Sequence, residues 1–99
     1  MSVSLSTDLD DPSAIPYFLW DEPMTVSEFR QRLETSSPTE RTRLLAKQMR
    51  EARDTDVWKF ISPQEVWQRW PELRPRLGRR RDFWEFILGR WHKEGLVGC

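Results

Sequence analysis

The segment that decides the fold is Ser37–Arg53, SPTERTRLLAKQMREAR. It opens on a helix-capping box, with the Ser37 hydroxyl and the Glu40 carboxylate three residues apart, and Pro38 stands at the first helical position, where its missing N–H costs nothing. We predict a helix from Pro38 to about Arg53. Its two faces are Leu44, Leu45, Gln48, Met49 and Ala52 on one side and Arg43, Lys47, Arg50 and Arg53 on the other. The first face is spaced for burial, so this helix should carry the core.

Similar capping patterns occur on both sides of this segment. Thr25–Glu28 predicts a helix that runs to about Glu34, and Ser62–Glu65 predicts a helix that Pro71 should stop. Residues 57–61 predict a short helix between them. No segment has the alternation of a confident strand.

The last helix should run from about Arg79 to Glu94, before Gly95. Its apolar residues cover an arc of about 140°, and Phe86 widens this arc to about 200°, roughly twice what an ordinary surface helix needs. This helix is therefore either central to the domain or covered on a second side by something else. The apolar set is Phe83, Trp84, Phe86, Ile87, Leu88 and Trp91.

These patterns predict an all-α fold, a compact bundle of about five short helices with an extended N-terminal aromatic arm. Residues 1–15 should be a flexible acidic tail, 16–95 a single helical domain, and 96–99 a frayed terminus. The arm is 16–24, and within it PYFLWDEP (16–23) has a proline at each end. Because four large apolar side chains should not remain in water, we expect the arm to pack across the helices. Asp21 or Glu22 would then pair with an arginine such as those of Arg79–Arg81.

Charge and composition narrow the function classes. The 16 basic and 16 acidic residues balance, although residues 1–30 hold six acidic residues and one basic residue. One cysteine and one histidine exclude a metal cluster built from those residue types. The N-terminus lacks the pattern of a secretory signal, and no apolar run approaches the about 20 residues that span a bilayer, so we expect a cytoplasmic protein.

No catalytic constellation is evident. His92 stands alone near a helix end, and catalysis there would need a nucleophile such as Cys99 held in fixed geometry. We therefore expect no enzyme activity and no cofactor.

Two features point to binding. Six arginines fall between Arg74 and Arg90, and they suit phosphate, an acidic partner, the chain's own acidic front, or plain solvation. A helix–turn–helix pattern over 54–70 would offer Gln64, Gln68 and Arg69 to DNA, but zero net charge argues against nucleic acid. The six tryptophans fit either a core or a binding surface: Trp20, Trp58, Trp67, Trp70, Trp84 and Trp91.

The pieces YFLWD, LLAKQMREARDTDVWKF and RRRDFWEF, within residues 16–91, together resemble small prokaryotic proteins often encoded beside a nucleotidyltransferase of the abortive-infection AbiE type. The resemblance implies a toxin–antitoxin pair, in which the nucleotidyltransferase is the toxin and uses NTP and Mg²⁺ itself. The chain would be the antitoxin-like partner that restrains or assists it.

We therefore predict a non-enzymatic protein that binds and regulates a nucleotidyltransferase toxin. The predicted contact residues are Tyr17, Phe18, Trp20, Asp21, Arg80, Arg81, Trp84 and Phe86. The alternatives are a small DNA-binding regulator that uses Gln64, Gln68 and Arg69, and a self-associating helical protein.

Overall fold

The computed structural model describes residues 4–98, and these residues are mostly helical. The α-helices are α1 (Val26–Thr35), α2 (Pro38–Glu51), α3 (Asp54–Val57), α4 (Pro63–Gln68), α5 (Trp70–Leu73) and α6 (Arg81–Lys93). Single 3₁₀ turns occur at η1 (Tyr17–Leu19), η2 (Arg74–Arg76) and η3 (Gly78–Arg80). Two short parallel strands, β1 (Leu5–Ser6) and β2 (Ile15–Pro16), complete the elements.

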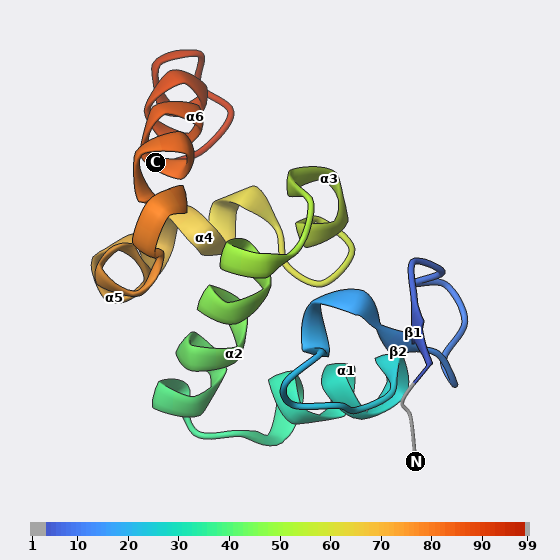
Figure 1. The fold of residues 1–99 in the computed structure, drawn as a ribbon. Coiled ribbons are helices and arrows are strands. Elements are labelled where there is room, and N and C mark those ends of the chain that lie inside the picture. The colour runs from blue at the N-terminus through green and yellow to red at the C-terminus, as the bar shows by residue number, and fades with distance from the viewer. Residues whose placement is uncertain (1–3, 99) are drawn as a thin grey trace.

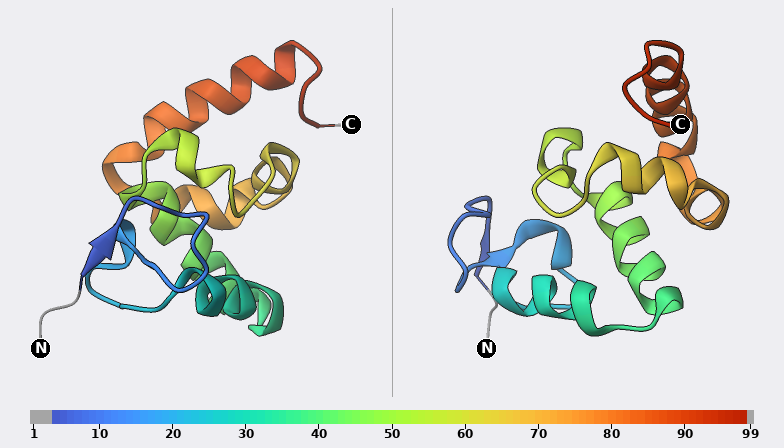
Figure 2. Two further views of the ribbon diagram at one scale, coloured as in Figure 1. Left: turned by 90° about the vertical axis from the view of Figure 1, so that its right-hand side faces the viewer. Right: turned by 180° about the vertical axis from the view of Figure 1, so that it is seen from behind.

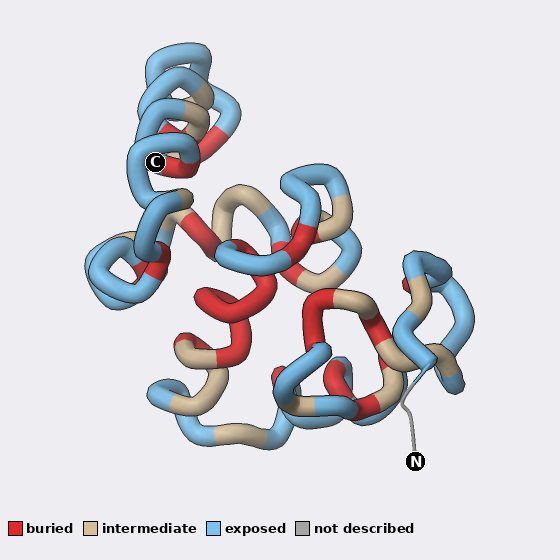
Figure 3. Tube along the Cα trace, in the orientation of Figure 1, coloured by how far each residue is buried: buried red, intermediate tan, exposed pale blue. Residues whose placement is uncertain are grey.

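Helix α2 runs through the middle of the molecule, with α1 and the N-terminal segment on one side and α4 to α6 on the other (Figure 1). The buried stretches of the chain gather on α2 and on the segments that face it (Figure 3). Helix α6 projects at one end and contributes to an elongated shape of 46 × 25 × 23 Å (Figure 2). The predicted helical core on α2 is confirmed.

The predicted helix starts are confirmed at three capping residues. Thr25 and Glu28 form a reciprocal capping box at α1, and the Ser37 and Ser62 hydroxyls accept the third amide N–H of α2 and α4. The carboxylate of Glu65 does not return to its cap, because Arg41 and Arg69 bind it instead. Local capping therefore sets the starts of these helices, and tertiary partners decide where the acidic side chains go.

The helix boundaries around prolines and glycines differ from the predictions. Pro71 does not stop a helix at residue 70; α4 ends at Gln68, and Pro71 stands in the first turn of α5. A proline fits that place because the first turn needs no internal N–H donor. The last helix begins at Arg81 rather than Arg79, because Gly78, at a φ of 54°, opens the 3₁₀ turn η3 before it.

The predicted aromatic arm over 16–24 packs on α2 as expected, but its extended conformation is a wrong prediction at Tyr17–Leu19. Ile15 and Pro16 form the short strand β2, and the chain then turns at once into η1. An extended chain would direct successive side chains to opposite faces, whereas a 3₁₀ turn lets the adjacent Phe18 and Leu19 both point inward. Both of these side chains are buried. Trp20, the next residue, is left outside.

The described parts of the two chain ends, for which the sequence predicted flexible segments, make contacts with the rest of the chain. Leu5 and Ser6 pair with Ile15 and Pro16, and Leu9 is buried in the core. The carbonyl of Ala14 accepts the N–H of Val26 at 2.8 Å, which ties the N-terminal segment to the start of α1. At the other end, Val97 is buried. Residues 1–3 and Cys99 of those predicted segments lie outside the described residues.

No helix within residues 4–98 is both long enough and apolar enough to cross a membrane.

Candidate interaction surface

Tyr17, the first predicted contact residue, uses its hydroxyl inside the chain. The hydroxyl donates to Asp56 Oδ2 at 2.6 Å and accepts the backbone N–H of Arg53 at 2.8 Å. Burial raises the pKa of Tyr17 above its ordinary value. This side chain joins η1 to the start of α3, and its hydroxyl is already engaged there.

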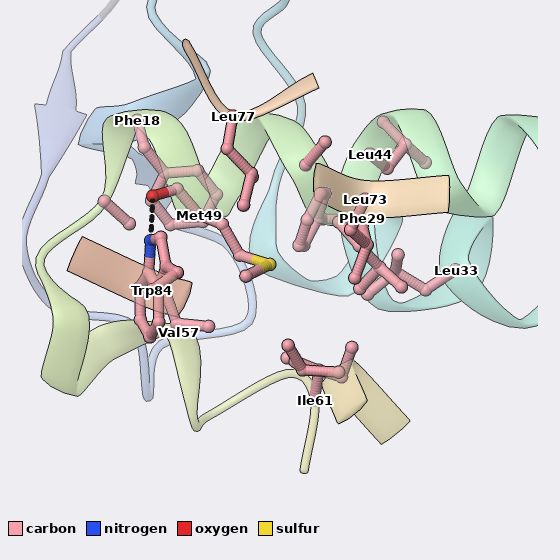
Figure 4. Packing of buried hydrophobic residues seen from close by; sticks show 14 of the residues in the cluster. Phe18, Phe29, Leu33, Leu44, Met49, Val57, Ile61, Leu73, Leu77 and Trp84 are labelled. Carbon is pink, nitrogen blue, oxygen red and sulfur yellow. Dashed lines mark hydrogen bonds between the residues drawn. The ribbon is translucent and has the colours of Figure 1, made fainter. Parts of the chain in front are cut away.

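Phe18 and Trp84 meet in one buried core rather than on a surface (Figure 4). Phe18 packs edge-to-face against Phe29 at 5.6 Å between ring centroids. Trp84 is 0% exposed and its indole Nε1 donates to the carbonyl of Met49 at 2.9 Å (Figure 4). The sequence predicts that both rings contact a partner. In the structure both are buried in the chain's own core, so neither has a face available to a partner.

The acidic pair Asp21–Glu22 binds α2 and not the arginines at 79–81. The carboxylate of Asp21 pairs with Lys47, and Glu22 makes a two-pronged ion pair with Arg43 at 3.0 and 2.8 Å. These hydrogen bonds hold the pKa values of both carboxyl groups below their ordinary range. Because η1 packs on α2, the acids that follow it reach the basic side of that helix.

The arginine cluster is largely solvated. Arg80 lies over the ring of Phe83 at 4.8 Å, and the Nε of Arg81 is 3.6 Å from the carboxylate of the adjacent Asp82. Arg74 pairs with Glu85 at 3.1 Å. Both members of that pair are about half exposed, and such ion pairs contribute little to stability. The arginine cluster therefore makes this surface basic, and its ion pairs hold the arginine side chains only weakly.

Phe86 and Trp20 are the two predicted contact residues that present aromatic surface to solvent. Trp20 is 59% exposed beside η1, and Phe86 is 65% exposed on α6. Phe86 lies beside Gly89, where an added Cβ would meet nothing within 4 Å. A hollow of about 450 Å³ runs along this side of the helix. We call this side the α6 outer face; its residues are Glu85, Phe86, Gly89, Arg90 and Lys93.

The predicted DNA-reading residues are mostly engaged within the chain. Arg69 donates to Glu65 at 2.8 Å, in a network that Arg41 also joins. Gln64 accepts the backbone N–H of Gly98 at 2.9 Å, and only Gln68 is exposed. Helix α4 has six residues, less than two turns. The arrangement does not present α4 as a free recognition helix.

Sequence reasoning missed a groove between α4, α5 and the end of the chain. It has a volume of about 470 Å³, and we call it the Trp67–Trp70 groove. Its lining residues are Gln64, Trp67, Gln68, Trp70, Pro71 and Gly98. The WQRWP motif at 67–71 signals aromatic content there. The return of residues 95–98 toward α4, which completes the groove, has no local sequence signal.

His92 has a structural environment. Its ring stacks on Trp67 at 4.3 Å, and its Nδ1 lies 3.2 Å from the carbonyl oxygen of Val97. Within residues 4–98, no group of three or more His, Cys, Asp or Glu side chains is placed to hold a metal ion.

Comparisons of the chain with protein-family models, curated proteins and solved structures found no match.

Proposed function

We propose that this chain is a non-enzymatic, antitoxin-like protein that binds and regulates a nucleotidyltransferase through the α6 outer face. The observation that supports the docking face is the exposure of Phe86, which points away from the buried side of α6. The identity of the partner rests on the resemblance of residues 16–91 alone. NTP and Mg²⁺ would belong to the partner.

The α6 outer face offers one large aromatic side chain, Phe86, and one arginine, Arg90, which are residue types enriched at interfaces. Large aromatic side chains that become buried at an interface contribute most of its binding energy, and burying a phenylalanine side chain is worth about 1.5–3 kcal/mol. Gly89 lies one turn from Phe86 and has no side chain, so a partner backbone can approach the helix closely. Phe86 is therefore the anchor of the proposed contact.

Charge indicates what kind of partner surface fits. Arg90 and Lys93 share the α6 outer face with Phe86 and with one acidic residue, Glu85, and residues 79–93 hold five basic and two acidic residues. Opposite charge on a partner speeds encounter and fixes orientation more than it adds affinity. We therefore propose an apolar pocket with an acidic rim on the nucleotidyltransferase. Trp20 is also exposed, but it follows η1 on the other side of α2, so it is not part of this docking face.

Co-purification tests the proposal. The chain is expressed with the product of the adjacent gene, which the proposal expects to be a nucleotidyltransferase, one protein carries a tag, and the mass and stoichiometry of the eluted species are measured. A stable complex is expected. Elution of this chain as a monomer or homodimer, with the nucleotidyltransferase left behind, would overturn the proposed function.

The docking face has a separate test with a matched control. Phe86→Ala should weaken the complex at least about tenfold, since loss of a hot-spot side chain costs about 2 kcal/mol or more. Leu96 has the same exposed fraction, 65%, but lies outside the α6 outer face, so Leu96→Ala should leave affinity unchanged. Equal affinities for both variants would place the docking face elsewhere.

A further inference from the structure

The side of α6 that faces away from the core has its charges sorted by position. Residues three and four apart are neighbours on the surface of a helix. One such stripe is formed by Asp82, Phe86, Gly89 and Lys93, and Glu85 and Arg90 lie beside it. Asp82, whose side chain is 87% exposed, extends the α6 outer face by one turn toward the helix start. The acidic residues are therefore at the start of this face, the basic residues are at its end, and the phenylalanine and the glycine lie between them.

This order makes the face complementary to an antiparallel copy of itself. In such a pair, each residue comes level with the residue that is equally far from the midpoint of the stripe, between positions 87 and 88. Asp82 then comes level with Lys93 of the second copy, and the acidic end of each helix lies along the basic end of the other. A parallel pair would instead bring Asp82 level with Asp82 and Lys93 level with Lys93, which places like charges together.

The same register matches the shapes at the centre of the face. Phe86 comes level with Gly89 of the second copy, because both are equally far from the midpoint. Phe86 is 65% exposed, and an added Cβ at Gly89 would meet nothing within 4 Å. The hollow of about 450 Å³ along this side of α6 is lined by both residues. Each ring can therefore lie over the glycine of the other copy, where no side chain keeps the two helices apart.

The contacts of these residues within the chain leave the face accessible. Glu85 pairs with Arg74 at 3.1 Å, and Arg90 pairs with Glu94 at 3.3 Å. These side chains are all about half exposed or more, so their ion pairs are weak and can be shared with a second copy. Lys93 forms no ion pair within residues 4–98. Helix α6 also projects at one end of the molecule, where another helix can approach it (Figure 2).

We propose that two copies of this chain associate through their α6 outer faces, with the two helices antiparallel. The arrangement has a two-fold axis, so every contact occurs twice. Each copy contributes far fewer than the about 20–30 residues of a standard interface, and the dissociation constant should therefore be high, about 0.1–1 mM. At the micromolar concentrations of an unfolding experiment the chain is then monomeric and Phe86 is exposed.

The pairing closes the α6 outer face to other partners. A nucleotidyltransferase that uses the same face would bind the monomer, and self-association would compete with it. This competition rests on the proposed function, whereas the pairing itself does not. The pairing is tested with this chain alone, so its failure and a failure of the co-purification are separate results.

Sedimentation equilibrium of the full chain tests the pairing. The concentration runs from about 10 μM to about 2 mM, which brackets the expected dissociation constant. A reducing agent is present so that Cys99 cannot join two copies covalently. The average mass should rise from that of one chain toward that of two. A mass that stays at one chain up to the highest concentration would overturn the inference.

Two substitutions test whether the α6 outer face is the contact. Phe86→Ala removes both rings from the pair and should abolish the rise in mass. Leu96 is equally exposed, at 65%, and lies outside the face, so Leu96→Ala should associate as the unchanged chain does. Association that survives Phe86→Ala would overturn the proposed interface.

Charge reversal tests the antiparallel register. Lys93→Glu brings two acidic residues level at both ends of the pair and should raise the dissociation constant about fivefold or more. Adding Asp82→Lys restores opposite charges at this position, so the double variant should return to within about twofold of the unchanged chain. Independent surface effects would not cancel in this way. A double variant that associates no better than Lys93→Glu would overturn the register.

Discussion

Helices α2 and α6 have almost the same length, 14 and 13 residues, but they are covered very differently. In α2 half of the residues are buried, including Lys47 and Gln48. In α6 only Trp84 and Leu88 are buried, although its composition is more apolar. Neighbours surround α2, while α6 rests on the molecule by one side (Figure 1). The comparison teaches that position in the fold, more than side-chain polarity, sets which residues of this protein are covered.

The same contrast separates the chain's aromatic residues by role. Phe18, Phe29 and Trp84 fill the core against α2, and their loss would remove packing (Figure 4). Phe86 fills nothing within residues 4–98. A large apolar side chain on the outer side of a helix offers an anchor that a partner can bury.

Trp84→Ala should have the largest effect on the free energy of unfolding. Removing this ring from the core should cost about 3–5 kcal/mol, because a cavity forms and the carbonyl of Met49 loses its donor. Urea unfolding measures this. Trp84→Phe keeps most of the packing and should cost less. A loss below about 1 kcal/mol in Trp84→Ala would mean that the Trp84 ring anchors α6 to α2 less firmly than its burial and hydrogen bond indicate.

Gln48→Met should stabilise the protein. The Gln48 side chain is fully buried, and neither its amide nitrogen nor its amide oxygen has a hydrogen-bond partner among residues 4–98. Leaving such groups unpaired costs about 1–3 kcal/mol, so a methionine of similar shape should raise the free energy of unfolding by about 1 kcal/mol. Gln31, on the exposed side of α1, provides the control: Gln31→Met should change stability by less than about 0.5 kcal/mol. A destabilised Gln48→Met would show that the amide is satisfied.

Acid should weaken the ion pairs that hold the segment after η1 on α2. The folded-state pKa values of Asp21 and Glu22 are lowered by their hydrogen bonds to Lys47 and Arg43, from ordinary values of 3.8 and 4.5. The stability they contribute is therefore complete above the ordinary values and is lost as the pH falls through the lower, folded values. Urea unfolding between pH 7 and pH 3 should show a smaller loss of stability in the double variant Asp21→Asn/Glu22→Gln than in the unchanged chain.

Glu34 gives the matched control for the acid experiment, because it forms no ion pair within residues 4–98. Glu34→Gln should lose stability with acid as the unchanged chain does. If the double variant also follows the unchanged chain, the Asp21–Lys47 and Glu22–Arg43 pairs do not hold η1 on α2 in solution.

Phe86→Ala should have the smallest effect on the free energy of unfolding, within about 0.5 kcal/mol, because the ring is mostly in solvent already. The measurement is the same urea unfolding, compared with Trp84→Ala. Destabilisation above about 1.5 kcal/mol would mean that the α6 outer face is covered in the isolated protein, as in a homodimer. The contrast with α2 would then be lost.

Much of the fold was predictable because capping and helical periodicity act over three or four residues. Thr25, Ser37 and Ser62 each marked a helix start correctly. The buried face of α2 followed from its spacing. The predicted extended conformation around Phe18 was wrong, because a run of adjacent apolar residues does not distinguish an extended segment from a single 3₁₀ turn. For the candidate surface, the sequence predicted both Phe86 and Trp84 as contact residues and did not distinguish the exposed ring from the buried one.

By itself the sequence determined where the helices start, which side of α2 is apolar, and that α6 has more apolar surface than one face of a helix needs. Those properties are local, because they arise from side chains within a turn or two of one another. Tertiary structure alone decided that Lys47 and Arg43 bind Asp21 and Glu22, that Trp84 is the buried ring and Phe86 the open one, and that Gly98 returns to Gln64 and closes the rim of a groove. Each of these joins residues far apart in the chain, and no local pattern records which distant surfaces meet when one small core is filled.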